Sequence, residues 1–198
     1  MVLKEKVWMA LLAAAVLLTV GAKYSPYFPG DVAVTRFVQG ITPASTGWAQ
    51  RISSTAEFPW SLVLVAIAVV VSWRMFGWRA ALLALTCFAG MWIIGKVVGP
   101  IIARPRPSPD LVHVARKLSG YSFPSIFALV YASTVGFMGV LFALRSKGPF
   151  RIIVPILCCV LLLLGWAARL SLGAHWPSDV ILSYLIGLLW SGLLVRFV

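Results

Sequence analysis

The sequence predicts an all-α membrane protein, a polytopic bundle of six transmembrane helices with an interfacial amphipathic helix. Of its 198 residues, 61% are hydrophobic and 11% are charged, and the mean hydropathy is +0.98. A water-soluble domain of this length needs a far more polar surface. The apolar residues also gather into long runs between short basic connections, which is typical of polytopic membrane proteins. The length suits a single domain over residues 1–198.

Six apolar segments define the predicted spans. Each is close to the ~20 residues that a helix needs to cross the hydrocarbon core. They are roughly Val7–Ala22, Trp60–Phe76, Ala80–Ile102, Pro124–Leu144, Ile152–Ala168 and Asp179–Phe197. We expect the first segment to be a retained membrane anchor rather than a cleaved signal peptide.

The longest connection, Lys23–Pro59, has a mixed composition. Within it, Val32–Ile52 places apolar side chains such as Phe37 among polar ones such as Arg36. This pattern predicts an amphipathic helix on the outer membrane surface, broken near Pro43. The alternative is an irregular loop with scattered apolar residues. In either case the segment shows no residue pattern typical of catalysis.

Two short connections, Arg74–Arg79 and Arg145–Arg151, are basic and contain no acidic residue. The positive-inside rule therefore makes their side of the membrane cytoplasmic, together with both termini. The remaining connections then face outward. We expect the protein to lie in the inner membrane of a bacterium, with its site facing the periplasm.

The formal net charge of +12 raises the question of nucleic-acid binding. No basic run is interleaved with aromatic residues, and the charges fall between apolar segments. We therefore expect no nucleic-acid partner, and assign the charges to topology, anionic headgroups and substrate phosphate. The three cysteines, Cys87, Cys158 and Cys159, lie inside apolar runs. They fit packing residues better than a metal site.

Charged residues from separate stretches converge at the outer boundary of the bundle. At about 1.5 Å rise per residue, Lys96 lies about 24 Å beyond Ala80, and Arg169 about 26 Å beyond Ile152. Both therefore emerge near the outer edge of a core about 30 Å thick. Three further groups, Arg104, His175 and Asp179, fall in or next to connections on the same side. Cations often only anchor a helix at this level, but an Asp is not needed for anchoring.

His175 and Asp179 are four residues apart, with Pro177 between them, at the start of the last apolar run. Pro and Asp both favour a first helical turn, in which residues four apart are neighbours. An Asp that accepts from one ring nitrogen leaves a lone pair on the other. A histidine nucleophile that attacks phosphorus needs this arrangement. Taken alone, such a pair is more often structural.

Three motif-like stretches lie between residues 96 and 179. They are Lys96 with Arg104-Pro105, then Pro124-Ser125, then Arg169, His175 and Asp179. In these stretches the chain resembles the type-2 phosphatidic acid phosphatase and vanadium haloperoxidase superfamily, specifically its six-helix membrane lipid phosphatases. The spacing from Arg169 to Asp179 matches that family, while Ala168 replaces its usual Ser and the first motif is one residue longer.

The resemblance implies a role for each matching residue. It assigns phosphate binding to four of them: Lys96, Arg104, Ser125 and Arg169. His175 would form a phosphohistidine, and Asp179 would orient its ring. The implied partner is a phosphorylated lipid in the bilayer. Three cations can neutralise a transferring phosphoryl group, and the sequence offers no carboxylate cluster for Mg²⁺, so we expect no metal and no other cofactor.

The second motif departs from the family, because Ile126-Phe127 stands where the family has Gly-His. That His protonates the leaving oxygen, a contribution of roughly 10²–10⁴ in rate. Phe127 cannot donate a proton, and Ile126 adds bulk where Gly lets the backbone approach phosphate. His113 is the other histidine of the chain and could reach the site from its loop; the alternative is an ordinary loop residue.

Three hypotheses remain open. In the first, the chain is a phosphatase whose leaving group hardly needs an acid. A leaving phosphate with a second pKa of about 6 meets that condition, which favours a polyprenyl pyrophosphate over a phosphatidate. In the second, the chain binds or transports a phosphorylated lipid without catalysis, and in the third it is an altered, inactive paralogue. Retention of both His175 and Asp179 favours the first hypothesis, because a pure binder needs only the cations.

Overall fold

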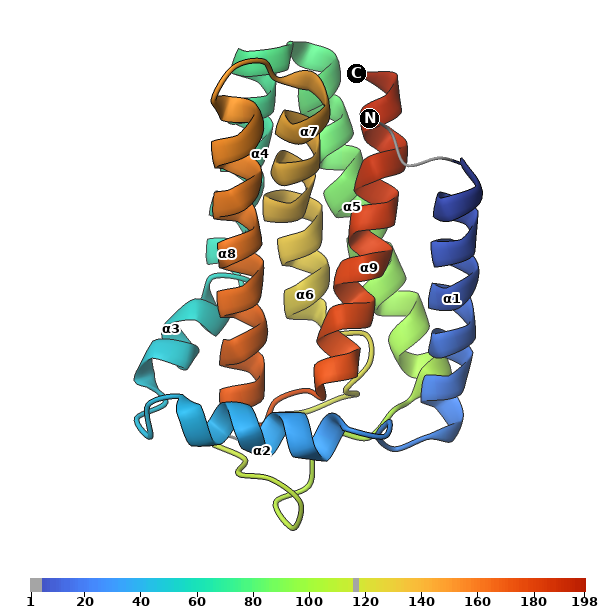
Figure 1. The fold of residues 1–198 in the computed structure, drawn as a ribbon, viewed down its shortest axis with the longest axis vertical. Coiled ribbons are helices and arrows are strands. Elements are labelled where there is room, and N and C mark those ends of the chain that lie inside the picture. Colours follow the sequence, from blue (N-terminus) through green and yellow to red (C-terminus); the bar gives the residue numbers. More distant parts are fainter. Residues whose placement is uncertain (1–4, 116–117) are drawn as a thin grey trace.

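The structure, a computed structural model, describes residues 5–115 and 118–198 (Figure 1). Every regular secondary-structure element within these residues is a helix. The α-helices are α1 Glu5–Tyr24, α2 Asp31–Ile41, α3 Gly47–Ser54, α4 Trp60–Phe76, α5 Trp78–Ile102, α6 Ile126–Tyr131, α7 Phe137–Arg145, α8 Phe150–Ser171 and α9 Pro177–Leu194. The π-helical turn Ala132–Gly136 joins α6 to α7, and a 3₁₀ turn, Val195–Phe197, follows α9.

All six apolar segments predicted to span the membrane form helices. Among the described residues, five helical stretches are long and apolar enough to cross a membrane: α1, α5, Ile126–Arg145, α8 and Pro177–Phe197. The sixth, α4, is apolar but has only 17 residues. The all-α bundle is therefore confirmed, with five spans of full length and one shorter helix.

The rod Ile126–Arg145 lies at the centre of the bundle. Of its most apolar stretch, 78% is buried by other parts of the chain, compared with 22% for α5 and 11% for α8. The outer helices instead expose large apolar side chains such as Leu163 and Ile152, each 64% exposed. That distribution suits a central helix packed on protein and peripheral helices that face lipid.

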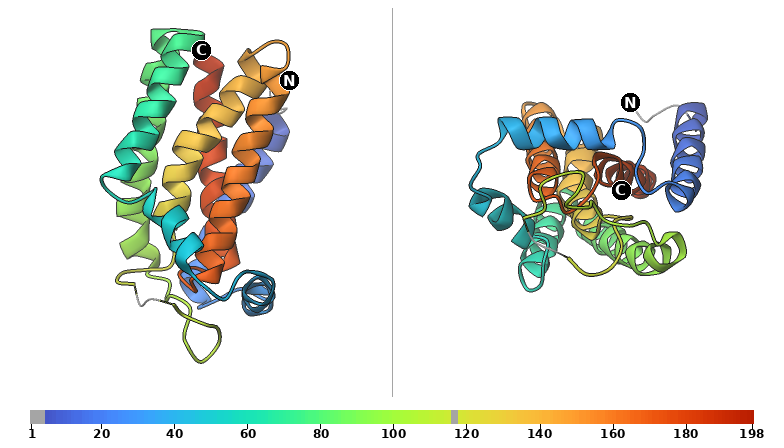
Figure 2. Two further views of the ribbon diagram at one scale, coloured as in Figure 1. Left: turned by 90° about the vertical axis from the view of Figure 1, so that its left-hand side faces the viewer. Right: turned by 90° about the horizontal axis from the view of Figure 1, so that it is seen from below.

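The two ends of the bundle differ in character. The start of α1, the C-terminus and the short basic turns α4–α5 and α7–α8 lie at one end (Figure 1). At the other end α2 lies across the bundle instead of along it, and the loop between α5 and α6 projects beyond it (Figure 2). The polar residues discussed below all belong to this second end.

The predicted amphipathic segment Val32–Ile52 is covered by two helices, α2 and α3, which extend slightly beyond it and are separated by the break near Pro43 that the sequence predicts. Val38 of α2 is buried in the same cluster as Leu170 of α8. Phe37 is 66% exposed. One face of α2 therefore packs on the bundle and the other presents apolar side chains outward, as an interfacial helix requires.

The loop between α5 and α6 is fixed to the turn between α8 and α9. The Ala115 amide donates to the Leu172 carbonyl at 3.1 Å. Gly173 has φ +60°, and a Cβ there would stand 2.2 Å from the His113 carbonyl oxygen. Only glycine combines this left-handed backbone with so close an approach. These contacts hold the loop against the segment that carries His175.

Candidate functional site

A cavity of about 190 Å³ opens at this end of the bundle. It is lined by Ser53, Ala56, Glu57, Arg106, Leu118, Ser119, Ile126, Phe127, Arg169 and His175. A second cavity of about 230 Å³ shares Ser53, Glu57, Leu118 and Arg169 with it. Residues from α3, α6, α8 and three connections therefore meet around one cavity.

His175 lies in the turn between α8 and α9 and is 2% exposed. Its Nδ1 is 2.6 Å from the carbonyl oxygen of Ser122, and its Nε2 is 3.3 Å from a guanidinium nitrogen of Arg106. A carbonyl can only accept a hydrogen bond and a guanidinium can only donate one. The two neighbours thus favour the tautomer with the proton on Nδ1 and the lone pair on Nε2.

The surroundings of His175 also keep the ring neutral. Burial lowers the pKa of His175 well below its ordinary value, and the charges of Arg169 and Arg106 lower the pKa further. The hydrogen bond to the Ser122 carbonyl acts in the opposite direction and is the weaker influence. At neutral pH the imidazole therefore presents a nucleophilic Nε2 beside two cations.

The two arginines of the cavity are held from different sides. Arg106 donates to the Ala174 carbonyl at 2.7 Å and to the Ser119 carbonyl at 3.2 Å. Arg169, in the last turn of α8, donates to the Ser53 hydroxyl at 3.0 Å and lies 5.4 Å from the centroid of the Phe127 ring. Burial lowers the pKa of Arg106, but guanidinium remains charged in proteins. The pair suits a phosphate group.

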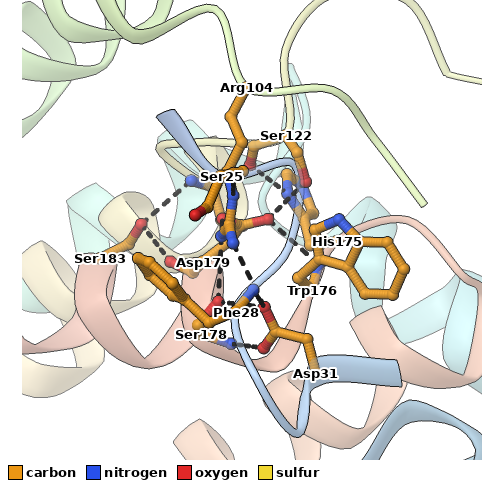
Figure 3. A network of polar contacts seen from close by, with 11 residues as sticks. Ser25, Phe28, Asp31, Arg104, Ser122, His175, Trp176, Ser178, Asp179 and Ser183 are labelled. Atoms are coloured by element: carbon orange, nitrogen blue, oxygen red, sulfur yellow. Dashed lines mark hydrogen bonds and ion pairs between the residues drawn. The ribbon is translucent and has the colours of Figure 1, made fainter. Parts of the chain in front are cut away.

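Arg104 lies outside this cavity, in a buried ionic network (Figure 3). Its side chain is fully buried and forms ion pairs with Asp179 and, at 3.3 Å, with Asp31. It also donates to the Ser178 hydroxyl at 3.0 Å and to the Ser25 carbonyl at 3.1 Å. The prediction that Arg104 faces phosphate thus disagrees with this geometry, because two carboxylates already occupy its guanidinium.

Asp179 contacts His175 through an intermediary (Figure 3). Its carboxylate accepts hydrogen bonds from Arg104, from the Ser122 hydroxyl and, at 3.1 Å, from the Trp176 amide. The predicted direct bond to His175 is replaced, since the ring Nδ1 meets the Ser122 carbonyl instead. The prediction that Asp179 lies in the first turn of a helix that begins near Pro177 is confirmed.

The second motif closes the cavity without contributing an acid. Ser125 is fully buried, caps α6 by accepting from the Ala128 amide at 3.4 Å, and is not among the residues that line the cavity. The Phe127 ring lines the cavity and stacks on Tyr131, with ring centroids 4.3 Å apart. An aromatic side chain therefore occupies the wall from which the family histidine would act.

Lys96 and His113 lie apart from His175. Lys96 lines a separate cavity of about 100 Å³, with its ammonium 5.6 Å from the Trp92 ring. Ile126 lines both that cavity and the one with His175. His113 is exposed and lines a fourth cavity, of about 260 Å³. The structure thus brings Arg169 and His175 together, and leaves the other predicted phosphate contacts outside.

Several residues at this end were not singled out from the sequence. They are Asp31, Ser53, Glu57, Arg106 and Ser122. A signal existed for Arg106, because Arg104-Pro105-Arg106-Pro107 repeats the Arg-Pro pair of the first motif. For Asp31, Ser53 and Glu57 no such signal exists. They belong to the connection in which no catalytic pattern is visible, and only folding brings it to the site.

Comparison with known proteins identifies the family. A model of the PAP2 superfamily matches residues 78–198. The fold is similar to the crystal structure of the first transmembrane PAP2 type phosphatidylglycerolphosphate phosphatase from Bacillus subtilis, with a TM-score of 0.74 and 22% identity over 93% of this chain and 94% of that one. No curated protein sequence matches the chain significantly. The matched residues make up more than half of the chain and include Arg106, Arg169 and His175, so this integral membrane protein belongs to the PAP2 superfamily.

Proposed function

We propose that the chain hydrolyses a phosphorylated lipid through a phosphohistidine formed on Nε2 of His175. The observation that supports this most directly is the state of that ring. It is buried and neutral, its proton is held on Nδ1 by the Ser122 carbonyl, and its Nε2 lies beside Arg106. A binding protein needs cations for phosphate, but it has no need of a histidine held in one tautomer.

In the proposed reaction a phosphoryl group enters the cavity between Arg106 and Arg169. The Arg106 guanidinium turns from Nε2 to the phosphate oxygens, which frees the lone pair. Nε2 attacks phosphorus, and the bond to the leaving oxygen breaks with its electron pair on that oxygen. The two guanidiniums offset the charge on the other phosphoryl oxygens. Asp179 acts at a distance, by fixing the serine whose carbonyl orients His175.

Arg106 takes the role that the resemblance gave to Arg104. It lines the cavity and lies 3.3 Å from the nucleophilic nitrogen, whereas Arg104 is neutralised by two carboxylates. Under this proposal Arg104 is a positioning residue for Asp179. Lys96 and Ser125 would contribute only if substrate binding rearranged the walls around Ile126.

The proposed substrate class is a lipid pyrophosphate, such as a polyprenyl pyrophosphate. Phe127 cannot protonate a leaving alkoxide, whereas a phosphate leaves readily without an acid. The adjoining cavity of about 230 Å³ also offers room beyond the reacting phosphoryl group. Phosphatidylglycerol phosphate, the substrate named for the Bacillus subtilis protein, carries its terminal phosphate as a monoester, so attack on that phosphate expels phosphatidylglycerol as an alkoxide. The basic turns at the opposite end favour a site on the outer face of a bacterial inner membrane.

Phosphate release tests the proposal. Purified protein in detergent is given farnesyl pyrophosphate, phosphatidylglycerol phosphate or phosphatidate, and the same assays are run with His175→Ala. We expect release from the pyrophosphate at least roughly 10²-fold above either monoester, and background rates for His175→Ala. His113→Ala is the matched control, since His113 lines another cavity. Equal rates of phosphate release by His175→Ala and wild type would contradict the proposed enzymatic activity. Binding of a phosphorylated lipid without phosphate release would support a lipid-binding or transport role.

A further inference from the structure

The second half of the proposed reaction needs a base. A phosphohistidine is released when water attacks phosphorus, and that water must lose a proton. The side chain of Phe127 cannot accept one, although it lines the cavity wall. Arg106 and Arg169 are cations without a lone pair to offer. His175 is itself the phosphorylated group at this stage.

Glu57 is the carboxylate among the residues that line this cavity. It also lines the adjoining cavity, so it stands where the two spaces join. Its side chain is exposed, in contrast to the buried Asp31 and Asp179. Those two aspartates are engaged by Arg104, whereas Glu57 faces a space that water can enter.

The segment that carries Glu57 is anchored to the core at Ser53 and at Thr55. The Ser53 hydroxyl accepts from Arg169 at 3.0 Å. The Thr55 hydroxyl is 2.6 Å from the hydroxyl of Tyr131, the residue on which Phe127 stacks. The Glu57 amide donates to the Ser54 carbonyl at 3.0 Å. The backbone that carries Glu57 is therefore held against the core, and Glu57 lines the same cavity as His175.

We propose that Glu57 is the general base that activates water to hydrolyse the phosphohistidine. This inference rests on the proposed function and assigns its second step. The water oxygen bonds to phosphorus as its proton passes to the Glu57 carboxylate. The P–N bond breaks with its electron pair returning to Nε2 of His175, and inorganic phosphate is released. The exposed carboxyl group then gives its proton to bulk water. Arg106 and Arg169 offset the repulsion between Glu57 and phosphate.

The test separates phosphorylation of the enzyme from its dephosphorylation. Wild type and Glu57→Gln are mixed with farnesyl pyrophosphate labelled in its terminal phosphate, quenched in alkali at millisecond to second times, and assayed for label on protein and for released phosphate. We expect Glu57→Gln to take up label as fast as wild type and to retain it. Its steady-state release should fall by roughly 10²-fold or more. Peptide mapping should place the label on His175.

Asp110→Asn is the matched control, because it removes an exposed carboxylate from the same end of the protein and its partner is Ser108. It should behave as wild type. Turnover of Glu57→Gln within about twofold of wild type overturns the assignment. So does slow turnover without retained label, since the defect then precedes the phosphoenzyme. If wild type also forms no label and His175→Ala releases phosphate equally fast, the proposed function itself fails, and the role of Glu57 with it.

Discussion

Ser122 connects Asp179 to His175 by its two oxygens. Its hydroxyl donates to the Asp179 carboxylate, and its carbonyl lies 2.6 Å from Nδ1 of the imidazole. Asp179 thus controls the ring through the backbone of Ser122, two residues before the second motif. A residue of α9 and a residue of the α5–α6 loop must both be in place before His175 has its reactive tautomer.

Asp179→Asn should lower both stability and activity. The variant leaves Arg104 buried with Asp31 as its remaining charged partner, at 3.3 Å. Loss of one partner of a buried pair typically costs about 3–5 kcal/mol. Thermal unfolding in detergent and phosphate release measure the two effects. Asp110→Asn, in which an exposed charge is lost, should leave both near wild type. An Asp179→Asn protein as stable as wild type would show that the network contributes little.

Lysine substitutions at Arg104 and Arg106 should have opposite consequences. Arg104→Lys cannot contact Ser25, Ser178 and both aspartates together, so it should lower the melting temperature markedly. Arg106→Lys should reduce kcat/KM by roughly 10²-fold with a smaller change in melting temperature, because it weakens contact with the phosphoryl group. Paired melting curves and kinetics distinguish the two roles. If Arg104→Lys lowers kcat/KM more than Arg106→Lys does and leaves the melting temperature unchanged, Arg104 rather than Arg106 contacts the phosphate.

The activity should persist to unusually low pH for a histidine nucleophile. Burial, Arg169 and Arg106 hold the pKa of His175 well below its ordinary value of 6.5, and the neutral form is the nucleophile. A profile of kcat/KM should therefore stay level as pH falls through 6.5 and decline only at lower pH. Arg169→Met removes one cause of the shift, so its acidic limb should move to higher pH. An unmoved limb would contradict this electrostatic coupling.

The same shift links pH to folding. Below pH 6.5 the unfolded chain binds a proton at this histidine and the folded chain does not. Stability therefore decreases as pH falls below 6.5 and levels off beneath the lowered pKa of the folded state. Unfolding curves across this range should show the decrease in wild type and in His113→Gln. The dependence should weaken in His175→Gln, and its persistence there would assign it to another group.

Restoring the family residues at the second motif should bring back monoester hydrolysis. Phe127 lines the cavity, so a histidine at this position stands within the site. Ile126→Gly with Phe127→His should raise phosphate release from phosphatidate by roughly 10²-fold. The Phe127 ring packs closely on Gly165, so some stability should be lost. Ile126→Gly with Phe127→Ala loses the same packing without gaining an acid. Equal rates for the two double variants would exclude an acid role at this position.

Much of the fold follows from the sequence because lipid imposes a simple rule. A chain in hydrocarbon must satisfy its backbone hydrogen bonds internally, so apolar runs become helices whatever their neighbours are. The six runs were predictable for this reason. The break near Pro43 and the start of α9 at Pro177 were predictable because proline interrupts a helix but suits its first turn. The π-helical turn Ala132–Gly136 within the central rod was not predictable. It depends on packing between helices.

The sequence by itself singled out Arg169, His175 and Asp179 as candidate site residues, because their spacing resembles the third motif of the family. Which arginine meets the cavity was decided by tertiary structure alone. Arg104 and Arg106 are both followed by Pro, and they differ only in what folds against them. Asp31, from a helix 73 residues away, pairs with Arg104 and leaves Arg106 to the cavity with His175. Charge pairing between distant segments depends on three-dimensional proximity, which a motif does not encode.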